Sequence, residues 1–514
     1  MTFVSILGLL AALALQIAGP SDLFHQTQPR TIANTADILI HGRWVLPREQ
    51  GELPATKPPL YNWVAVPFVW AFGSDSEIAH KMPSVLALIA CWAMTLWIVR
   101  RFLSQSDHKR AIVISAMASL MFVATYTTYK LGYLARPDML LTLWFLLAWW
   151  SSTEILLGNN AWNGRLLRFV FWSAVALAWL TKGPVGILPM VYALIAAKVL
   201  AGTFGAAALK WRWGLPLSLV PFAAWAFAAY DLDGDHVINT LWRDEFFGRI
   251  IGEGPETPDE GAIALLAGIY KMPYYFLLRG APWSLLAVAG LALLWMRRRH
   301  PELRSIDRPL RACALWMLIV LAFFTLSAGK RADYIASVYP ASSILAAWAL
   351  VHMAASLRRA AWTATTAAAI TLGVLGTIDW LEWPSPMPRG YGRSVNAFID
   401  RAGEIIAAEP RPVALWRIPD IHLATFLGIN ESHSTEHLLR MLRRNDRLWL
   451  LAGERSEGDN AGEIDLEQQS FIERFDLTLT PMLSSNDVVG GELWPRRVTL
   501  YRVDAERRRR RASD

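Results

Sequence analysis

The chain has 514 residues, of which 54% are hydrophobic and 18% are charged, and it carries a formal net charge of +7. Soluble domains contain about 25% charged residues, so this composition excludes an ordinary soluble protein and indicates an integral membrane protein. The basic residues fall in short loops between apolar segments, which the positive-inside rule explains better than nucleic-acid binding does. Both cysteines lie in apolar runs, so a disulfide framework is excluded as well.

Eleven apolar segments have roughly the length that a helix needs to cross a bilayer, which is ~20 residues. They span residues 2–19, 79–100, 111–129, 139–157, 167–182, 184–201, 214–230, 278–296, 312–328, 334–351 and 360–380. The first segment lacks the basic residues that open a signal peptide, so we expect it to be a retained span. A further run, 60–72, would cover only about 20 Å as a helix, which is short of the ~30 Å hydrocarbon core.

The basic loops predict how the chain is threaded through the membrane. If 60–72 does not cross, all of these loops face the cytoplasm, as the positive-inside rule requires. They hold Arg100, Arg101, Lys109, Arg110, Arg165, Arg168, Lys198, Lys210, Arg212, Arg297, Arg298, Arg299, Arg304, Arg308, Arg311, Arg358 and Arg359. A crossing at 60–72 would place every one of them outside. We therefore predict an interfacial helix at 60–72 on the outer surface and a cytoplasmic N-terminus.

The same threading places six segments on the outer side of the membrane. They are residues 20–78, 136–138, 182–184, 231–272, 330–333 and 381–514. Each carries polar or charged residues next to a helix end, where ionisable side chains are costly and usually functional. The acids in 231–272 predict a flexible loop that acts as a flap over a substrate.

A change of composition after residue 380 predicts two domains, a transmembrane domain over 1–380 and a small α/β domain over 381–514. The second, more charged domain has short apolar runs that predict strands and segments with helical spacing. The strands are expected at 413–416, 448–451 and 498–501, and the helices at 422–427 and 435–443. The basic run from Arg507 to Arg511 is either a solvated tail or a contact with anionic lipid headgroups.

Lys57 lies in the first outer segment and is followed by Pro58 and Pro59. Two prolines cannot continue a helix from the lysine, so the chain must turn before the apolar run 60–72 begins. This places a cation at the water–lipid boundary, close to the level of a lipid phosphate. Lys57 is either a loop lysine that only sets topology or a ligand of such a phosphate.

Four stretches carry charged residues at the outer ends of the predicted spans. They are Gly42-Arg-Trp-Val-Leu-Pro with Lys57-Pro-Pro-Leu-Tyr, Arg136-Pro-Asp-Met-Leu-Leu, Leu180-Thr-Lys-Gly-Pro-Val-Gly, and Phe324-Thr-Leu-Ser-Ala-Gly-Lys-Arg-Ala-Asp-Tyr. In this order they resemble the signatures of the bacterial dolichyl-phosphate-mannose and aminoarabinose (ArnT-like) glycosyltransferase family. The likeness covers roughly residues 1–350.

The resemblance implies the GT-C fold, an α-helical polytopic membrane protein of about 11 to 13 transmembrane helices. It implies inverting transfer of a sugar from a polyprenyl (undecaprenyl) phosphate to a lipid, glycan or protein acceptor. The reaction would take place on the periplasmic side of the bacterial inner membrane, as in modification of lipid A or of a cell-envelope glycan. We expect no required cofactor and no nucleic-acid partner, contact with membrane lipids, and a monomer.

Transfer from such a donor releases a polyprenyl phosphate, whose growing negative charge must be stabilised by cations placed in advance. The outer segments supply several candidates, each of which would alternatively anchor a lipid headgroup. The expected phosphate-binding side chains are Lys57, Arg30, Arg249 and Lys330, with Arg331 beside them and the hydroxyls of Tyr334 and Tyr339 as further donors. The resemblance supports Arg30 and Arg249 in particular, since family members carry phosphate-contacting basic residues at similar places.

Asp138 follows Pro137 at the start of a predicted span, where the helix dipole favours an anion. It either complements that dipole or serves as a site carboxylate with Lys57, pairing with a lysine or touching the sugar. Lys182 lies at an outer turn and either contacts substrate or simply ends a helix. Tyr61 and His25 are weaker candidates for positioning the substrate.

The sequence departs from the family near residue 27. Members usually carry Asp-Glu-x-Arg-Tyr after the first span, whereas this chain has Thr27-Gln-Pro-Arg-Thr31, which keeps the arginine and loses both acids. Either His25 or Asp22 takes over the role, or Asp138 serves alone, or the acceptor needs no base because it is an ionised phosphate. The remaining alternative is a non-catalytic or impaired homologue that binds polyprenyl-linked sugar.

Asp231, Asp233 and Asp235 open the long outer loop around a glycine. Clustered carboxylates are the ligands that Ca²⁺ and Mg²⁺ prefer, so a divalent cation there is the weaker of two interpretations. The favoured one is a solvated helix exit, because no glutamate completes an EF-hand loop. The sequence shows neither a phosphate-cradling glycine loop, nor Cys/His metal spacing, nor a nucleophile elbow, which leaves soluble enzyme classes without support.

Overall fold

The computed structural model describes the chain except for residues 24–26, 50–52, 104–106, 159–161, 202–206, 249–267, 301–306, 383–390, 417, 419–420, 430–433, 446, 456–476, 490–495 and 506–514. The chain divides into two compact units, which are described separately. Unit 1 consists of Met1–Ala18, Thr56–Val64 and Lys81–Thr377. Unit 2 consists of Gly19–Ala55, Ala65–His80 and Ile378–Asp514.

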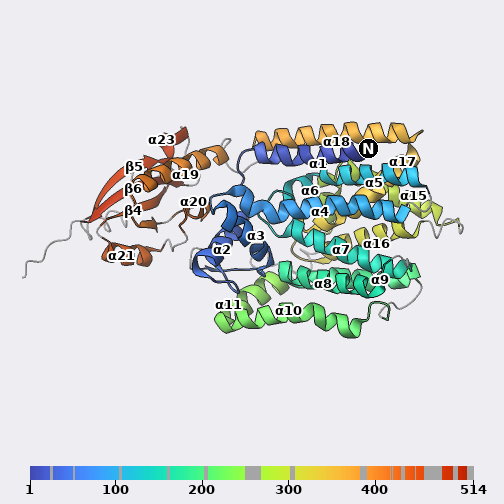
Figure 1. The fold of residues 1–514 in the computed structure, drawn as a ribbon, viewed down its shortest axis with the longest axis horizontal. Helices are drawn as coiled ribbons and strands as arrows, with labels where there is room; N and C mark the ends of the chain where they lie inside the picture. The colour runs from blue at the N-terminus through green and yellow to red at the C-terminus, as the bar shows by residue number, and fades with distance from the viewer. Residues whose placement is uncertain are drawn as a thin grey trace, which may run out of the picture. The chain divides into compact units, whose positions relative to one another are not determined.

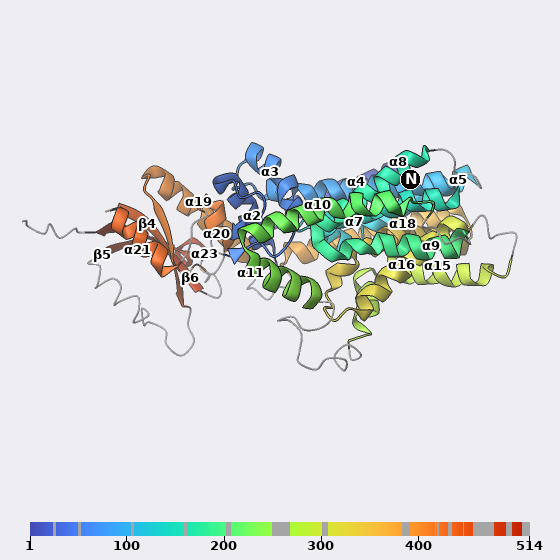
Figure 2. The ribbon, with the colours of Figure 1, turned by 90° about the horizontal axis from the view of Figure 1, so that it is seen from below.

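Unit 1 is a bundle of helices that run side by side in both views (Figures 1 and 2). Helices cover most of each of the eleven predicted spans, but 278–296 is interrupted by a 111° bend between α14 and α15 and 111–129 by a break between α5 and α6. Its elements are α1 (Thr2–Ala18), α5 (His108–Val123), α6 (Tyr126–Leu131), α7 (Asp138–Leu157), α8 (Gly164–Lys182), η1 (Gly183–Ile187), α9 (Leu188–Ala201), α10 (Trp211–Leu232), α11 (Gly234–His236), η2 (Val237–Gly248), α14 (Lys271–Arg279), α15 (Trp283–Arg297), α16 (Arg308–Leu326), η4 (Ala332–Val338), α17 (Tyr339–Met353) and α18 (Leu357–Trp380). Two more helices, α3 (Leu60–Phe72) and α4 (Glu77–Leu103), have residues in both units, as does α18, whose end from Ile378 belongs to unit 2.

Seven of the described helical segments are long and apolar enough to cross a membrane, and an eighth is reached if the bent pair α14 and α15 counts as one. In the apolar 18-residue window of each segment, 89% of the window is buried in Ala332–Met353 and 72% in α7. The corresponding share is only 22% in α10 and in α18. Helices that are apolar all round but poorly covered by protein are suited to face lipid. The bundle is therefore centred on α7 and α17, and Cys91 and Cys313 are buried free thiols within it.

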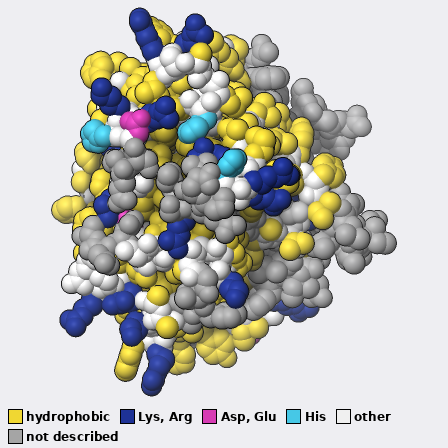
Figure 3. Space-filling view, turned by 90° about the vertical axis from the view of Figure 1, so that its right-hand side faces the viewer, with side chains coloured by type: hydrophobic (Ala, Val, Ile, Leu, Met, Phe, Trp, Pro, Cys, Tyr) yellow, Lys and Arg dark blue, Asp and Glu magenta, His cyan; other side chains and the backbone are white. Residues whose placement is uncertain are grey.

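The basic loops gather at one end of unit 1. Arg101 at the end of α4 pairs with the buried Glu154 near the end of α7 (3.1 Å). Arg308 at the start of α16 donates to the carbonyl of Leu200 at the end of α9 (2.6 Å). Figure 3 looks onto the end at which α5 begins and α15 ends, and it shows Lys and Arg side chains around a largely hydrophobic surface. The predicted grouping of these loops is thus present, while their cytoplasmic orientation stays a prediction.

Unit 2 contains α2 (Gln28–His41), the short pair β1 (Arg48–Glu49) and β2 (Leu53–Pro54), and a four-stranded sheet. The sheet has the order β3-β4-β6-β5, with β3 (Val413–Trp416) parallel to β4 (Arg447–Arg455) and the other pairs antiparallel. Further elements are β5 (Leu477–Ser484), β6 (Arg496–Ala505), α19 (Tyr391–Ala408), α20 (Ile421–Phe426), α21 (Thr435–Arg444) and α23 (Ser485–Val489).

The predicted strands and helices of this small sheet domain are confirmed, and three elements were missed, namely β5, α19 and the short helix α23. The missed strand β5 contains Pro481 and bulges there against β6, which obscures its alternation. The missed helix α19 buries Val395, Phe398 and Ala402 in the core under the sheet. Asp37 of α2 is fully buried and accepts from the Arg43 guanidinium (2.9 Å), so it anchors the segment that follows α2.

Candidate functional site

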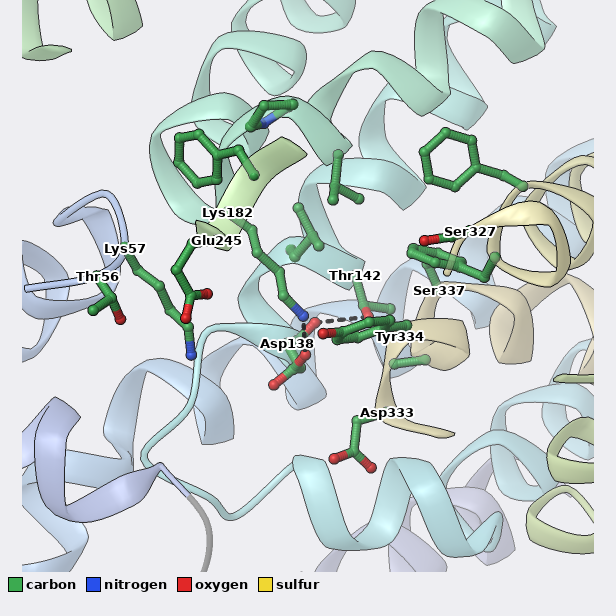
Figure 4. Close-up of a pocket in the computed structure, with 17 residues that line it drawn as sticks. Thr56, Lys57, Asp138, Thr142, Lys182, Glu245, Ser327, Asp333, Tyr334 and Ser337 are labelled. Carbon is green, nitrogen blue, oxygen red and sulfur yellow. Dashed lines mark hydrogen bonds and ion pairs between the residues drawn. The ribbon is translucent and has the colours of Figure 1, made fainter. Parts of the chain in front are cut away.

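Unit 1 contains a cavity of about 760 Å³, including its open mouth, at the end of the bundle where α7 begins and α8 ends. Its lining comes from segments far apart in the sequence and divides into a polar part and an apolar wall (Figure 4). The polar part holds Thr56, Lys57, Asp138, Thr142, Lys182, Glu245, Ser327, Asp333, Tyr334 and Ser337. The apolar wall is made by Leu141, Pro184, Val185, Phe246, Phe323, Phe324 and Ala336.

Asp138 is the first residue of α7 and is only 3% exposed, because two cations enclose it. Lys182 at the end of α8 donates to one carboxylate oxygen (2.5 Å), and Arg136 lies 3.1 Å from the other. A buried charge is tolerated only when it is paired in this way. Lys182 therefore does more than end α8, because its ammonium forms an ion pair with Asp138 on a second helix.

The side-chain hydroxyls of Ser84 and Tyr61 hydrogen-bond to backbone carbonyls of the turn before α7. Ser84 donates to the carbonyls of Leu134 (2.6 Å) and Arg136 (3.1 Å). The Tyr61 hydroxyl also bonds the Leu134 carbonyl (3.3 Å) and is buried, with 2% of the side chain exposed. Tyr61 thus supports the backbone from which Arg136 and Asp138 project, and it does not line the cavity.

A second carboxylate extends this network of charges. Asp333, in η4, accepts from Arg136 (2.8 Å) with one oxygen and from Arg279 of α14 (2.8 Å) with the other. Arg279 in turn lies over the rings of Tyr126 and Tyr275, at 5.6 Å and 5.9 Å. Alternating charges therefore run from α14 through η4 and the Arg136 turn to α7 and α8. This charge network fixes the polar part of the cavity.

Lys57 enters the cavity from the loop before α3, and Pro58 and Pro59 behind it are buried. Its pKa is lowered to about 7, first by burial and then by the nearby positive charges of Arg136 and Lys182. The negative charges of Asp138 and Glu245 oppose this shift. An anion that entered the cavity would restore the charged form of this lysine.

Tyr334 and Lys330 belong to the loop between α16 and α17. The Tyr334 ring packs against Phe324 (5.4 Å between centroids), and the Lys182 ammonium lies 4.7 Å from its centre. Lys330 donates to the carbonyl of Ser327 (2.9 Å), a residue of the cavity lining. Tyr334 is thus in the cavity, and Lys330 is bonded to its wall.

The structure brings four of the predicted site residues to one cavity: Lys57, Asp138, Lys182 and Tyr334. Arg30 belongs to unit 2, where its guanidinium pairs with Glu49 (3.2 Å). Arg249 and His25 lie outside the described residues. Tyr339 is buried and hydrogen-bonded to the Thr127 hydroxyl (3.3 Å).

Sequence reasoning missed four charged residues of this site: Arg136, Glu245, Asp333 and Arg279. Three of them had a signal, since Arg136 stands two residues before Asp138, Glu245 stands four residues before Arg249 and Asp333 directly precedes Tyr334, in stretches already singled out. Arg279 had none, because it looks like an ordinary basic residue near the start of an apolar segment.

The acidic stretch that opens the long loop does not support a metal site. Among the residues that the structure describes, no group of three or more His, Cys, Asp or Glu side chains is placed to hold a metal ion. Asp233 instead accepts from the backbone N–H of His236 (3.2 Å) and caps the short helix α11.

The position of the missing acids lies in unit 2. Gln28 is fully buried at the start of α2, and its amide donates to the carbonyl of Asp22 (2.8 Å) and to the Asp22 carboxylate (3.3 Å). Gln28 is therefore held by hydrogen bonds within its own segment, at a position where family members carry an acid.

No family model matches the sequence. The undecaprenyl phosphate-α-4-amino-4-deoxy-L-arabinose arabinosyl transferase 1 of Pseudomonas fluorescens is 23% identical over 396 residues, which are 74% of this chain and 67% of that protein. The corresponding transferase of Pseudomonas paraeruginosa is 26% identical over 335 residues, which are 61% of this chain and 53% of that protein. The chain thus spans about half to two thirds of the length of these relatives.

Solved structures show the same fold at low sequence identity. ArnT from Cupriavidus metallidurans, crystallised with undecaprenyl phosphate, matches 96% of this chain and 97% of its own, with a TM-score of 0.67 and 16% identity. The archaeal oligosaccharyltransferase AglB from Archaeoglobus fulgidus matches 88% of this chain and 69% of its own, with a TM-score of 0.50 and 11% identity. The chain thus has the fold of the ArnT structure and is similar in sequence to bacterial undecaprenyl phosphate-aminoarabinose transferases.

Proposed function

We propose that this chain is an inverting glycosyltransferase that takes a sugar from an undecaprenyl-type phosphate and passes it to a lipid, glycan or protein acceptor. The observation that carries the proposal is the meeting of Lys57 and Lys182 with Asp138 and Tyr334 in one cavity at the end of the bundle. The names of the bacterial relatives, and the undecaprenyl phosphate bound in the ArnT crystals, support this class of donor.

In this proposal Lys57 binds the donor phosphate and stabilises it as it departs. The phosphate gains negative charge when the bond to the sugar breaks, and a buried cation nearby lowers the energy of that state. Arg249 and Lys330 are proposed as its partners, and the Tyr334 hydroxyl as a further donor. The apolar wall, with Phe323 and Phe324 at its centre, suits the first isoprenoid units of the carrier.

Asp138 is proposed to act through its partners. A carboxylate enclosed by Arg136 and Lys182 is a poor proton acceptor, since two opposite charges favour its ionised form. We therefore infer that Asp138 is a positioning residue, whose ion pairs hold the side chains of Lys182 and Arg136 in place. Removal of the proton from a hydroxyl acceptor then does not depend on Asp138.

The proposed orientation places the cavity on the periplasmic side of a bacterial inner membrane. The opposite end of unit 1 carries the basic loops, which the positive-inside rule assigns to the cytoplasm. The N-terminus would then be cytoplasmic and the C-terminal sheet domain periplasmic. Cysteine-accessibility labelling at residues 57 and 298 tests this, and we expect residue 57 to react from the periplasmic side only.

The direct test uses the purified full chain in lipid nanodiscs. We expect it to bind undecaprenyl phosphate and to transfer radiolabelled sugar from an undecaprenyl phosphate-linked donor to a component of a bacterial envelope extract. A small panel of donors, beginning with the aminoarabinose lipid, identifies the sugar. A protein that neither binds the carrier nor releases sugar from any donor of this kind contradicts the proposal.

A second candidate is a non-catalytic homologue that only binds polyprenyl-linked sugar. The observation in its favour is the replacement of the two acids by Thr27 and Gln28, with the Gln28 amide hydrogen-bonded to Asp22. This candidate predicts carrier binding without transfer, and transfer that appears when Thr27→Asp and Gln28→Glu are introduced together. Transfer by the unaltered chain rules it out.

A further inference from the structure

Glu245 is a cavity carboxylate without an assigned role. It comes from η2 (Val237–Gly248), is partly buried, and lines the same cavity as Lys57. In Figure 4 its carboxylate and the Lys57 ammonium extend from separate segments into the same part of the cavity. The negative charge of Glu245 is also one of the two that act in favour of the charged form of Lys57.

The other two carboxylates of the lining belong to the charge network described above. Asp138 binds Lys182 and Arg136, and Asp333 binds Arg136 and Arg279, so both maintain this network. Glu245 reaches the cavity from another element, on the side of Lys57 (Figure 4).

A carboxylate next to the binding site of an anion needs a physical reason. If Lys57 holds the donor phosphate, Glu245 repels that phosphate, and like charges at short range disfavour binding. The repulsion is offset if positive charge appears beside the phosphate during the reaction. Glycosyl transfer produces such charge, because the sugar ring becomes oxocarbenium-like as its bond to the leaving group breaks.

We propose that Glu245 is a catalytic carboxylate that stabilises the positive charge developing on the donor sugar, as Lys57 stabilises the negative charge developing on the phosphate. The inference rests on the proposed function and adds a residue to it. Glu245 and Lys57 then carry opposite charges beside the two ends of the breaking bond. The developing positive charge on the sugar and negative charge on the phosphate are therefore stabilised more in the transition state than in the bound donor.

For a hydroxyl acceptor, the step balances without a covalent intermediate. The electron pair of the C1–O bond moves to the phosphate oxygen, and the acceptor oxygen forms the new bond to C1 from the opposite face. The acceptor proton passes through water to the departing phosphate, which leaves as the polyprenyl hydrogen phosphate. Donor and leaving group each carry one negative charge, and Glu245 forms no covalent bond in the step.

The experiment compares Glu245→Gln, Glu245→Asp and Asp244→Asn in the full chain in nanodiscs, with the donor that the unaltered protein turns over. Glu245→Gln keeps the shape and removes the charge, so we expect kcat to fall about 100-fold with little change in KM. The affinity for undecaprenyl phosphate should stay the same or rise, because a source of repulsion is gone. Asp244→Asn, next to it but outside the cavity lining, should behave like the unaltered chain.

Glu245→Asp keeps a charge one methylene further back and should recover part of the lost kcat, even if either variant is less stable. A Glu245→Gln protein with unaltered kcat overturns the inference. So does a parallel loss of kcat and of undecaprenyl phosphate binding, which would mean that Glu245 only orients Lys57. Failure of the proposed function looks different, because the unaltered chain would then neither bind the carrier nor transfer sugar.

Discussion

Arginines at the two ends of unit 1 differ in their burial. At the cavity end Arg136 is only 4% exposed and touches two carboxylates, Asp138 and Asp333. At the other end Arg298 and Arg299 are exposed and lie over the indole of Trp295, at 4.4 Å and 5.9 Å. Exposed cations of the second kind are screened and contribute little individually, whereas enclosed ones hold fixed positions. Arg101, at the same end as Arg298, is also paired with a buried carboxylate but is itself 24% exposed. The comparison therefore teaches that burial of the cation, more than pairing, separates Arg136 from the cations that set topology.

Replacing Lys57 tests this distinction with the largest expected effect. Lys57→Ala should reduce transfer about 1000-fold, because the leaving phosphate loses a buried counter-charge. Transfer is measured with radiolabelled donor in nanodiscs, and Arg298→Ala from the opposite end is the matched control, expected to have no effect. Equal losses of transfer activity in the two variants would contradict the proposed difference between the two ends.

Removing the charge of Asp138 tests whether the enclosed network also stabilises the fold. Asp138→Asn leaves Lys182 without its counter-charge and Arg136 with Asp333 alone, and removing one partner of a buried pair costs about 3–5 kcal/mol. The matched change at the other end is Asp307→Asn, whose partner Arg297 is partly exposed (27%), so the loss there should be smaller. Thermal unfolding in detergent measures both, and a larger loss for Asp307→Asn would contradict the comparison.

The pH dependence of carrier binding sharpens the comparison further. The pKa of Lys57 is about 7, so below pH 7 the empty site holds a charged lysine and above it a neutral one. The phosphate binds the charged form, so the affinity for undecaprenyl phosphate should fall about tenfold per pH unit between pH 7 and 9. Lys57→Arg should remove this dependence, because arginine stays protonated. If the affinity of Lys57→Arg fell with pH as steeply as that of the unaltered chain, the pH dependence would arise from another group.

Arg279 gives the smallest expected effect, since it touches the cavity only through Asp333 and Arg136. It is 33% exposed, so its ion pair is partly screened. Arg279→Ala should lower kcat about fivefold with KM nearly unchanged, and Arg279→Lys should restore part of it, as expected for a positioning residue. An effect as large as that of Lys57→Ala would place Arg279 in direct contact with substrate.

Local properties of the sequence determined the membrane class of the chain, the helical segments and the short strands. Apolar length and loop charge act over a single segment, so helices cover most of each predicted span and the basic loops gather at one end. Strand β5 escaped prediction because Pro481 interrupts its pattern, and only pairing with β6 defines it. The motif around Lys57 was recognised for the same local reason, since two prolines fix a turn wherever the segment lies.

Only the tertiary structure decided what the charged residues do. Lys182 lies 44 positions from Asp138, and Arg136 lies 197 positions from Asp333, so helix packing creates both pairs. The same packing assigned Tyr61 to support the turn before α7 and gave Glu245 its place in the cavity. An ion pair depends on distance and burial in three dimensions, and a one-dimensional pattern of charges contains neither.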